Sequence, residues 1–220
     1  MKVNQLKAGV VLSYTGMVVS NIISLVYTPV MLRLLGKSEY GLYQLVYSVV
    51  SYLGLLNFGF NNAYLRFYSR YRAQKNDQAV RSLNGMFLTA FSVLSLIAFV
   101  CGIFLSFHCD ILFSGEVETT QISTASVLCV LMTVNLTLVF PNGLFEAYAS
   151  AHEQYIFQRI ISLSQSVLNP LLTIPLLLAG FRSVSLILVQ TFLTVCKLSV
   201  NVWYCTHKLG MRFSFRNMQI

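Results

Sequence analysis

Charged residues are scarce in this chain. Asp, Glu, Lys and Arg make up 10% of its 220 residues, against about a quarter in an ordinary soluble domain. Hydrophobic residues make up 56%, and the mean hydropathy is +0.68. The few charges fall in short groups, which are separated by long stretches that carry none. This composition excludes an ordinary soluble domain, because so little polar surface would be left to face water.

Catalytic and cofactor-binding motifs are also missing. The sequence contains no Walker lysine loop, no GxGxxG, no HExxH and no GxSxG. Its seven acidic residues form no convincing carboxylate pair for acid–base chemistry. Its five cysteines form no CxxC pair and no set with histidine at metal-site spacing. We therefore expect neither an enzyme nor a protein with a bound cofactor or metal.

Long apolar stretches are what the sequence has in abundance, and six of them reach the roughly 20 residues that a bilayer-crossing helix needs. They cover residues 8–32, 40–65, 82–108, 119–145, 160–181 and 183–205, and only the last contains a formal charge, Lys197. The sequence thus predicts an all-α, polytopic membrane protein, with a six-helix lobe over residues 1–207 and a basic cytoplasmic tail or linker over 208–220. The first stretch lacks the features of a cleavable signal peptide, so we expect it to persist as a helix.

The placement of positive charge predicts the orientation. With the N-terminus in the cytoplasm, eleven of the fifteen Lys and Arg residues fall on the cytoplasmic side, and only Arg33, Lys37 and Arg182 fall outside. Both termini are therefore expected to be cytoplasmic. The net charge of +8 would suggest nucleic acid in a soluble protein. Here we expect the basic residues to contact membrane lipid headgroups, with no nucleic-acid partner.

Two short segments carry a resemblance to a known family. Residues 28–43 read TPVMLRLLGKSEYGLY, and residues 52–67 read YLGLLNFGFNNAYLRF. Together they resemble the opening of polysaccharide biosynthesis flippases, the Wzx-type translocases of O-antigen and other repeat units. Those flippases belong to the multidrug/oligosaccharidyl-lipid/polysaccharide exporter superfamily. The resemblance is dense over residues 25–71, and beyond them it rests on the helix count and on residues 146–153, EAYASAHE.

The resemblance implies a transporter in the bacterial cytoplasmic membrane, whose substrate is an undecaprenyl-diphosphate-linked oligosaccharide. Family members are expected to have twelve to fourteen spans in two lobes, with the substrate path between them. The chain therefore looks like the N-terminal lobe, and we expect it to need a second lobe or to form a homodimer. Two alternatives stay open: a multidrug cation exporter of the same superfamily, which would want a buried acidic residue, and a non-transporting scaffold for polysaccharide enzymes.

Five polar residues near or within the predicted helices are the candidates for substrate binding: Arg33, Asn57, Asn62, Arg66 and Lys197. Polar groups at membrane depth are costly, so they usually face a cavity or a neighbouring helix. Lys197 either contacts the diphosphate or extends its stem toward the headgroups. Arg66 shares a helical face with Asn62, and it either receives the lipid headgroup or anchors the helix. Arg33 is either a headgroup contact on the outer side or an interfacial anchor.

Two glutamates have open interpretations of a similar kind. Glu39 lies near the start of the second predicted helix, where the helix dipole favours a carboxylate. Glu146 follows the fourth predicted helix, and it either couples a proton, pairs with a base of the last helix or simply ends its own helix. Pro170 and Pro175 are expected to kink the helix over 160–181.

Overall fold

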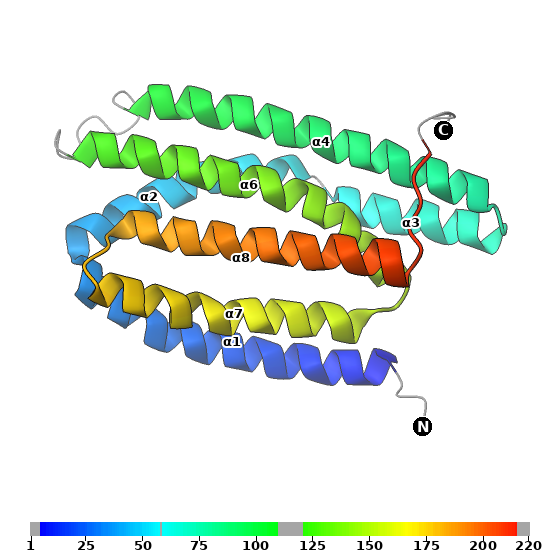
Figure 1. Cartoon of the computed structure of the whole chain (residues 1–220), viewed down its shortest axis with the longest axis horizontal. Helices are drawn as coiled ribbons and strands as arrows, with labels where there is room; N and C mark the ends of the chain where they lie inside the picture. Colours follow the sequence, from blue (N-terminus) through cyan, green and yellow to red (C-terminus); the bar gives the residue numbers. More distant parts are fainter. Residues whose placement is uncertain (1–4, 58, 110–120, 215–220) are drawn as a thin grey trace.

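The computed structural model describes residues 5–57, 59–109 and 121–214, and the regular structure in these ranges is helical throughout. In chain order the elements are α1 (Gln5–Leu35), α2 (Lys37–Leu53), the 3₁₀ turn η1 (Gly54–Asn57), α3 (Phe60–Ala73), α4 (Asp77–Phe107), α6 (Ile122–Ala151), α7 (Tyr155–Leu178), α8 (Ser183–Trp203) and the π-helical turn η3 (Tyr204–Lys208). The long helices run side by side in an elongated bundle (Figure 1). The all-α prediction is confirmed.

Five helices in the described ranges are long and apolar enough to cross a bilayer: α1, α4, α6, α7 and α8. Large apolar side chains stand more than half exposed on several of them, including Leu25, Leu96, Leu171 and Phe192. Water would solvate such faces poorly, whereas lipid chains solvate them well. The chain is therefore a multi-pass membrane protein.

The stretch over residues 40–65 differs from its prediction, because it is interrupted. The chain leaves α2 at Gly54, makes the turn η1 and begins α3 after Gly59, whose φ of 72° is a left-handed conformation that glycine adopts without strain. Figure 1 shows α2 beginning at the end of the bundle where α1 stops, and α3 ending at the other end. Among the described residues, five helices are long and apolar enough to span a bilayer, and α2, η1 and α3 run alongside them as a broken helix in place of one predicted span.

The connections alternate between the two ends of the bundle. One end, which we call the basic end, carries the α3–α4 and α6–α7 turns and most of the positive charges that flank the helices: Arg70, Arg72, Lys75, Arg81, Arg159, Lys208 and Arg212. The start of α1 and the end of η3 lie at this same end (Figure 1). At the opposite end the α1–α2 and α7–α8 turns are tight, and both use glycine with positive φ, Gly36 at 80° and Gly180 at 89°.

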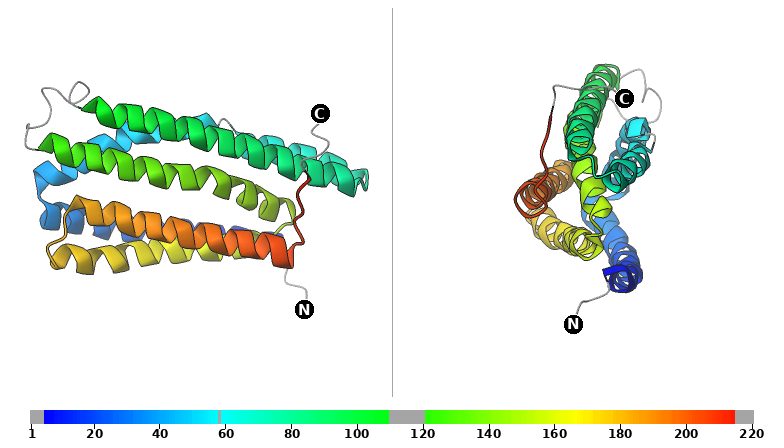
Figure 2. Two further views of the ribbon diagram at one scale, coloured as in Figure 1. Left: turned by 45° about the horizontal axis from the view of Figure 1, so that its top comes forward. Right: turned by 90° about the vertical axis from the view of Figure 1, so that its right-hand side faces the viewer.

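Helix α6 lies at the centre of the bundle and packs against α2, α3, α4 and α8, whereas α1 is held at one edge, mainly by α7 (Figure 2). Small and hydroxylated residues let α4 and α6 approach closely. Gly102 of α4 faces Thr133 of α6, and the Ser95 hydroxyl donates to the Thr137 carbonyl at 2.7 Å. Contacts of this kind drive helix association where lipid removes the usual hydrophobic force.

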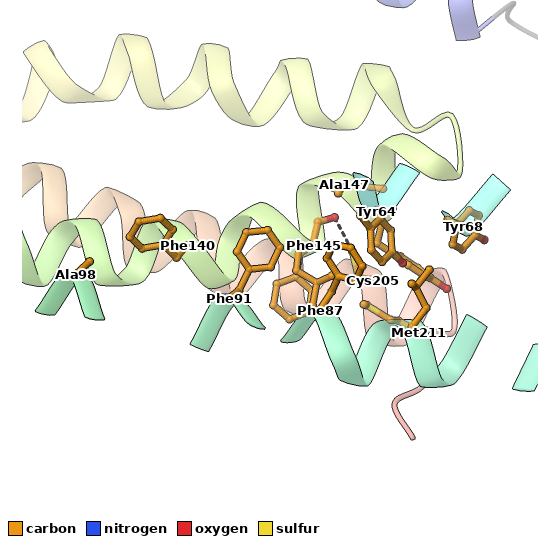
Figure 3. Close-up of a cluster of buried hydrophobic side chains, with 14 residues drawn as sticks. Tyr64, Tyr68, Phe87, Phe91, Ala98, Phe140, Phe145, Ala147, Cys205 and Met211 are labelled. Carbon is orange, nitrogen blue, oxygen red and sulfur yellow. Dashed lines mark hydrogen bonds between the residues drawn. The ribbon is translucent and has the colours of Figure 1, made fainter. Parts of the chain in front are cut away.

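An aromatic cluster fixes the basic end. It contains Tyr64, Tyr68, Phe87, Phe91, Phe145, Tyr148, Cys205 and Met211, contributed by α3, α4, α6, η3 and the segment after η3 (Figure 3). The Tyr64 hydroxyl donates to the Asn84 side-chain oxygen at 2.6 Å, and the Asn84 amide donates to the Arg212 carbonyl at 3.0 Å. Residues 209–214, which belong to the predicted tail or linker, therefore pack onto α4 and α6.

Candidate functional site

A polar cavity lies between α6, α7 and α8, toward the basic end. Its volume is about 170 Å³, and we call it the ionic cavity. It is lined by Glu146, Gln158, Arg159, Ile161, Ser162, Lys197 and Asn201. Two cations and one carboxylate thus surround a space within a bundle of apolar helices. Charge in that setting has to be paired or directed into a cavity, so this is where a charged ligand has reason to bind.

An ion pair joins α8 to α6 in this cavity. The Lys197 Nζ atom lies 2.7 Å from Glu146 Oε1, and the two side chains are 21% and 34% exposed. The Asn142 amide, one turn earlier on α6, donates to the same carboxylate oxygen at 2.9 Å. Asn201, one turn later on α8, donates to the Asn142 side-chain oxygen at 2.8 Å. The carboxylate is held by an ammonium and an amide, while the lysine keeps two further N–H donors.

Helix α7 closes the third side of the cavity. The Gln158 amide donates to the backbone carbonyl of Glu146, and the Ser150 hydroxyl donates to the Gln158 oxygen at 3.1 Å. These bonds tie the first turn of α7 to the last turns of α6. The exposed Arg159 is next to Gln158 and also lines a second cavity between α1 and α7, of about 380 Å³, together with several serines. Arg159 thus lines both the ionic cavity and this more apolar one.

Four of the five residues predicted to bind substrate lie away from this cavity, and only Lys197 lines it. Arg33 is exposed in the last turn of α1, at the opposite end of the bundle. Asn62 and Arg66 share the exposed face of α3, which packs on α4 and α6. In the part of the chain that the structure describes, no hydrogen bond or ion pair links Arg33, Asn62 or Arg66 to Lys197. The five residues therefore form no single site.

Asn57 lies at the break between α2 and α3. Its side-chain oxygen is buried and, among the described residues, has no hydrogen-bond partner, and the same is true of Asn61. Asn61 approaches α6 at Gly143, where an added Cβ would lie 3.2 Å from the Asn61 oxygen. Gly143, which follows Asn142 in the chain, thus leaves room for the Asn61 amide beside α6. The break between α2 and α3 is therefore followed by an amide that lies against α6, the helix of Glu146.

Sequence reasoning missed several residues of the ionic cavity. Glu146 was placed just beyond a helix ending at residue 145, whereas α6 continues to Ala151 and encloses it. The pairing with a base of the last helix, one of its open interpretations, is the one that the structure shows. Arg159 was treated only as a basic residue on the cytoplasmic side. One available signal was spacing, because Lys197 and Asn201 on α8, like Asn142 and Glu146 on α6, are four residues apart and share a helical face.

The extent of α6 bears on one of the alternatives. A multidrug cation exporter would want a buried acidic residue, and Glu146 lies more than one turn inside α6. Its carboxylate is paired with Lys197, however, which reduces the negative charge that it offers to an organic cation. With Arg159 included, the cavity lining has two positive side chains and one negative. The balance favours an anionic ligand.

Comparison with curated proteins and with solved structures finds no significant match to the chain. A family model described as polysaccharide biosynthesis protein matches residues 6–220, which is nearly the whole chain. This match agrees with the resemblance carried by residues 28–43 and 52–67 and extends it across every helix described above. The chain belongs to the polysaccharide biosynthesis protein family.

Proposed function

We propose that this protein forms part of a Wzx-type flippase, which moves a lipid-linked oligosaccharide across the bacterial cytoplasmic membrane. The carrying observation is the ionic cavity, where Lys197 and Arg159 line a space inside an apolar bundle of a polysaccharide biosynthesis family member. The diphosphate of undecaprenyl-diphosphate-linked sugars is the anion in this chemistry. Its lipid tail would remain among the bilayer chains while the charged and sugar parts enter the protein.

The depth of Lys197 supports this assignment. Lys197 lies six positions before Trp203, the last residue of α8, which is about 9 Å along the helix axis, and the helical turn η3 continues to Lys208. We propose that this places the cavity inside the hydrocarbon region, near the headgroups of the basic end. We assign the basic end to the cytoplasm, with both termini there, because positive residues are retained on that side. A precursor assembled in the inner leaflet would then meet Lys197 soon after leaving the headgroup layer.

The ion pair leaves part of Lys197 for an anion. Glu146 contacts the ammonium from α6, and Asn142 donates to the same carboxylate oxygen. A diphosphate entering between α7 and α8 would take up the remaining lysine donors, and Arg159 would supply a second cation. Movement of one lobe against another would then expose the cargo to the other leaflet. We propose that the second lobe comes from further chain or from another copy, and that α2, η1 and α3 together form the sixth crossing of this one.

Complementation tests the function. Cells that lack the native gene would receive wild type, Lys197→Met or Lys208→Met at matched protein levels. Lys208→Met serves as the control, because it removes an exposed cation outside the cavity. Wild type and Lys208→Met should restore surface polysaccharide. Lys197→Met should restore about tenfold less and should leave lipid-linked repeat units accumulated inside, because a cation in a desolvated site contributes more than 1 kcal/mol to anion binding.

Three outcomes would count against the proposal. Full export by Lys197→Met would remove the cavity from the transport path. Normal flipping in cells that lack the gene, with loss of co-purifying polysaccharide enzymes, would favour the scaffold. Increased sensitivity to cationic dyes with intact polysaccharide would favour the multidrug exporter.

A further inference from the structure

Another polar cavity lies closer to the opposite end of the bundle, between α1, α2, α7 and α8, and we call it the tyrosine pocket. Its volume is about 260 Å³. Its lining residues are Tyr27, Thr28, Met31, Tyr40, Tyr43, Gln44, Tyr47, Asn169, Leu186 and Gln190. The lining combines four phenol rings, three amides and one hydroxyl with two aliphatic side chains, and it contains no charged side chain. Nothing in it would balance the charge of a diphosphate, so a different part of a substrate fits here.

The rings are arranged in order along α2. Tyr43 and Tyr47, one turn apart, stack with their centroids 6.3 Å apart and their planes within 10° of parallel. On the adjacent face of α2 the Gln44 amide donates to the Tyr40 hydroxyl at 2.9 Å. This hydrogen bond orients the Gln44 and Tyr40 side chains. Tyr47 is 46% exposed, so part of its ring is accessible. The electron-rich faces of such rings attract weakly positive C–H groups, which are what the faces of a sugar ring present.

The amides of the pocket have unused hydrogen-bonding capacity. Within the described ranges the Gln190 side chain makes no hydrogen bond, and the amide N–H groups of Asn169 donate to no partner. The Thr173 hydroxyl donates to the Asn169 backbone carbonyl at 2.7 Å and lies 3.3 Å from its side-chain oxygen. A terminal amide offers two donors and an acceptor. Neutral donors and acceptors beside aromatic faces suit a polyhydroxylated, uncharged ligand.

The tyrosine pocket lies in line with the ionic cavity. Gln190 precedes Lys197 by seven residues on α8, which is two helical turns, so the two side chains share one face about 10 Å apart along the axis. The same interval separates Asn169 of the tyrosine pocket from Ser162 of the ionic cavity on α7. A diphosphate at Lys197 would therefore place its attached sugars toward Gln190 and Asn169.

We propose that the tyrosine pocket is a carbohydrate subsite that receives the first sugars of the lipid-linked substrate while its diphosphate is held at Lys197. The inference rests on the proposed function. It adds the place in the protein at which one glycan would be distinguished from another. The tyrosine faces of α2 provide the stacking surface, and Gln190 and Asn169 provide hydrogen bonds to hydroxyl groups.

Binding to two probes tests the subsite. The native gene product, purified into lipid nanodiscs, would be titrated with lipid-linked oligosaccharide extracted from cells that lack the protein, and with sugar-free undecaprenyl diphosphate. The variants are Tyr47→Leu, which keeps an apolar side chain but removes the ring, and Gln190→Met, which removes the amide. Tyr52→Leu is the matched control, because Tyr52 is a 71% exposed tyrosine of α2 outside the pocket.

We expect Tyr47→Leu and Gln190→Met each to weaken binding of the oligosaccharide probe by about five- to tenfold. Both variants should bind the sugar-free probe as wild type does, and Tyr52→Leu should match wild type with both probes. Equal weakening toward both probes, or unchanged binding of the oligosaccharide probe, would overturn the subsite. Failure of wild type to bind either probe would instead overturn the proposed function.

Discussion

The Glu39 carboxylate accepts two hydrogen bonds from Ser183, one from the backbone N–H at 2.8 Å and one from the hydroxyl at 2.9 Å. Glu39 is in the first turn of α2, and Ser183 is the fully buried first residue of α8. The contact therefore satisfies donors at the start of α8, which have no partner within their own helix, with a negative charge. It links the α1–α2 turn to the α7–α8 turn across 144 residues of sequence.

Replacing Glu39 should loosen the end of the bundle opposite the basic end. Hydrogen bonds to a charged group contribute about 1.5–3 kcal/mol, so Glu39→Ala should lower the unfolding temperature of the detergent-solubilised protein by several degrees. Ser183→Ala, which removes one of the two bonds, should cost less. The double variant should cost no more than Glu39→Ala alone, because the two residues act through one contact.

Glu153→Gln provides the control for this comparison, since Glu153 is exposed in the α6–α7 turn and its loss should leave the unfolding temperature unchanged. If Glu39→Ala were as stable as Glu153→Gln, the capping contact would contribute nothing measurable. Additive losses in the double variant would mean that Glu39 and Ser183 stabilise the protein through separate partners.

The length of the uncharged, apolar stretches and the placement of charge predicted most of the helices, because a bilayer imposes length and apolarity on each span. They did not predict the break between α2 and α3. Residues 40–65 carry no formal charge, so their hydropathy indicates one continuous helix. Gly59 interrupts that helix through its positive φ, which the sequence does not reveal. They also ended the fourth helix too early, at residue 145. The alanines and tyrosine that follow Glu146 continue the helix because Ala147, Tyr148 and Ala149 are buried in the bundle.

The sequence could not predict which polar residues of the candidate site contact one another. Lys197 was singled out by its position inside an apolar helix, but its partner Glu146 is 51 residues away, and only the packing of α8 on α6 brings them together. Glu39 is a similar case. Its position in the first turn of a helix was predicted correctly, but its contact with Ser183 at the start of α8 was not predicted. Arg33, Asn62 and Arg66 satisfied the same compositional argument as Lys197 and proved to be exposed. Which face a polar residue presents is decided by tertiary contacts.

His152, at the end of α6, should make the basic end sensitive to acid. Burial lowers the pKa of His152 below its ordinary value and the charge of Arg72 lowers it too, which together outweigh the hydrogen bond to the Tyr148 carbonyl that raises it. Nδ1 lies 3.0 Å from the Tyr148 carbonyl and donates to it, so in the neutral ring Nε2 accepts from the Tyr68 hydroxyl at 3.0 Å. Protonation would turn Nε2 into a donor and reverse the bond to Tyr68. The unfolded chain binds a proton more readily, so stability should fall as the pH drops below about 6.5.

The measurement is the unfolding temperature in detergent between pH 7.5 and pH 5. Wild type should lose stability over this range, and His152→Gln should lose less, because glutamine can make hydrogen bonds without titrating. His207→Gln, at an exposed histidine of η3, should keep the wild-type dependence. An identical acid response in wild type and His152→Gln would show that other groups cause it.

The contact between Gly102 and Thr133 should be the least tolerant of added volume between α4 and α6. A Cβ at residue 102 would overlap the Oγ1 and Cγ2 atoms of Thr133, which is fully buried and whose hydroxyl donates to the Cys129 carbonyl at 2.7 Å. Overpacking of this kind costs about 1–3 kcal/mol, so Gly102→Ala should lower the unfolding temperature clearly. Gly41→Ala is the matched control, because no atom lies within 4 Å of the added Cβ there, and alanine favours the helical conformation at this exposed position of α2.

A second substitution separates steric overlap from a general intolerance of change at Gly102. Thr133→Ala removes the two atoms that the new methyl group would overlap most closely, although the Thr133 Cβ, at 2.8 Å, would remain near it. The double variant Gly102→Ala, Thr133→Ala should therefore recover part of the lost unfolding temperature, even though Thr133→Ala alone removes buried volume and is itself destabilising. If the two losses simply added, the close approach of α4 and α6 at Gly102 would not be the cause of the instability.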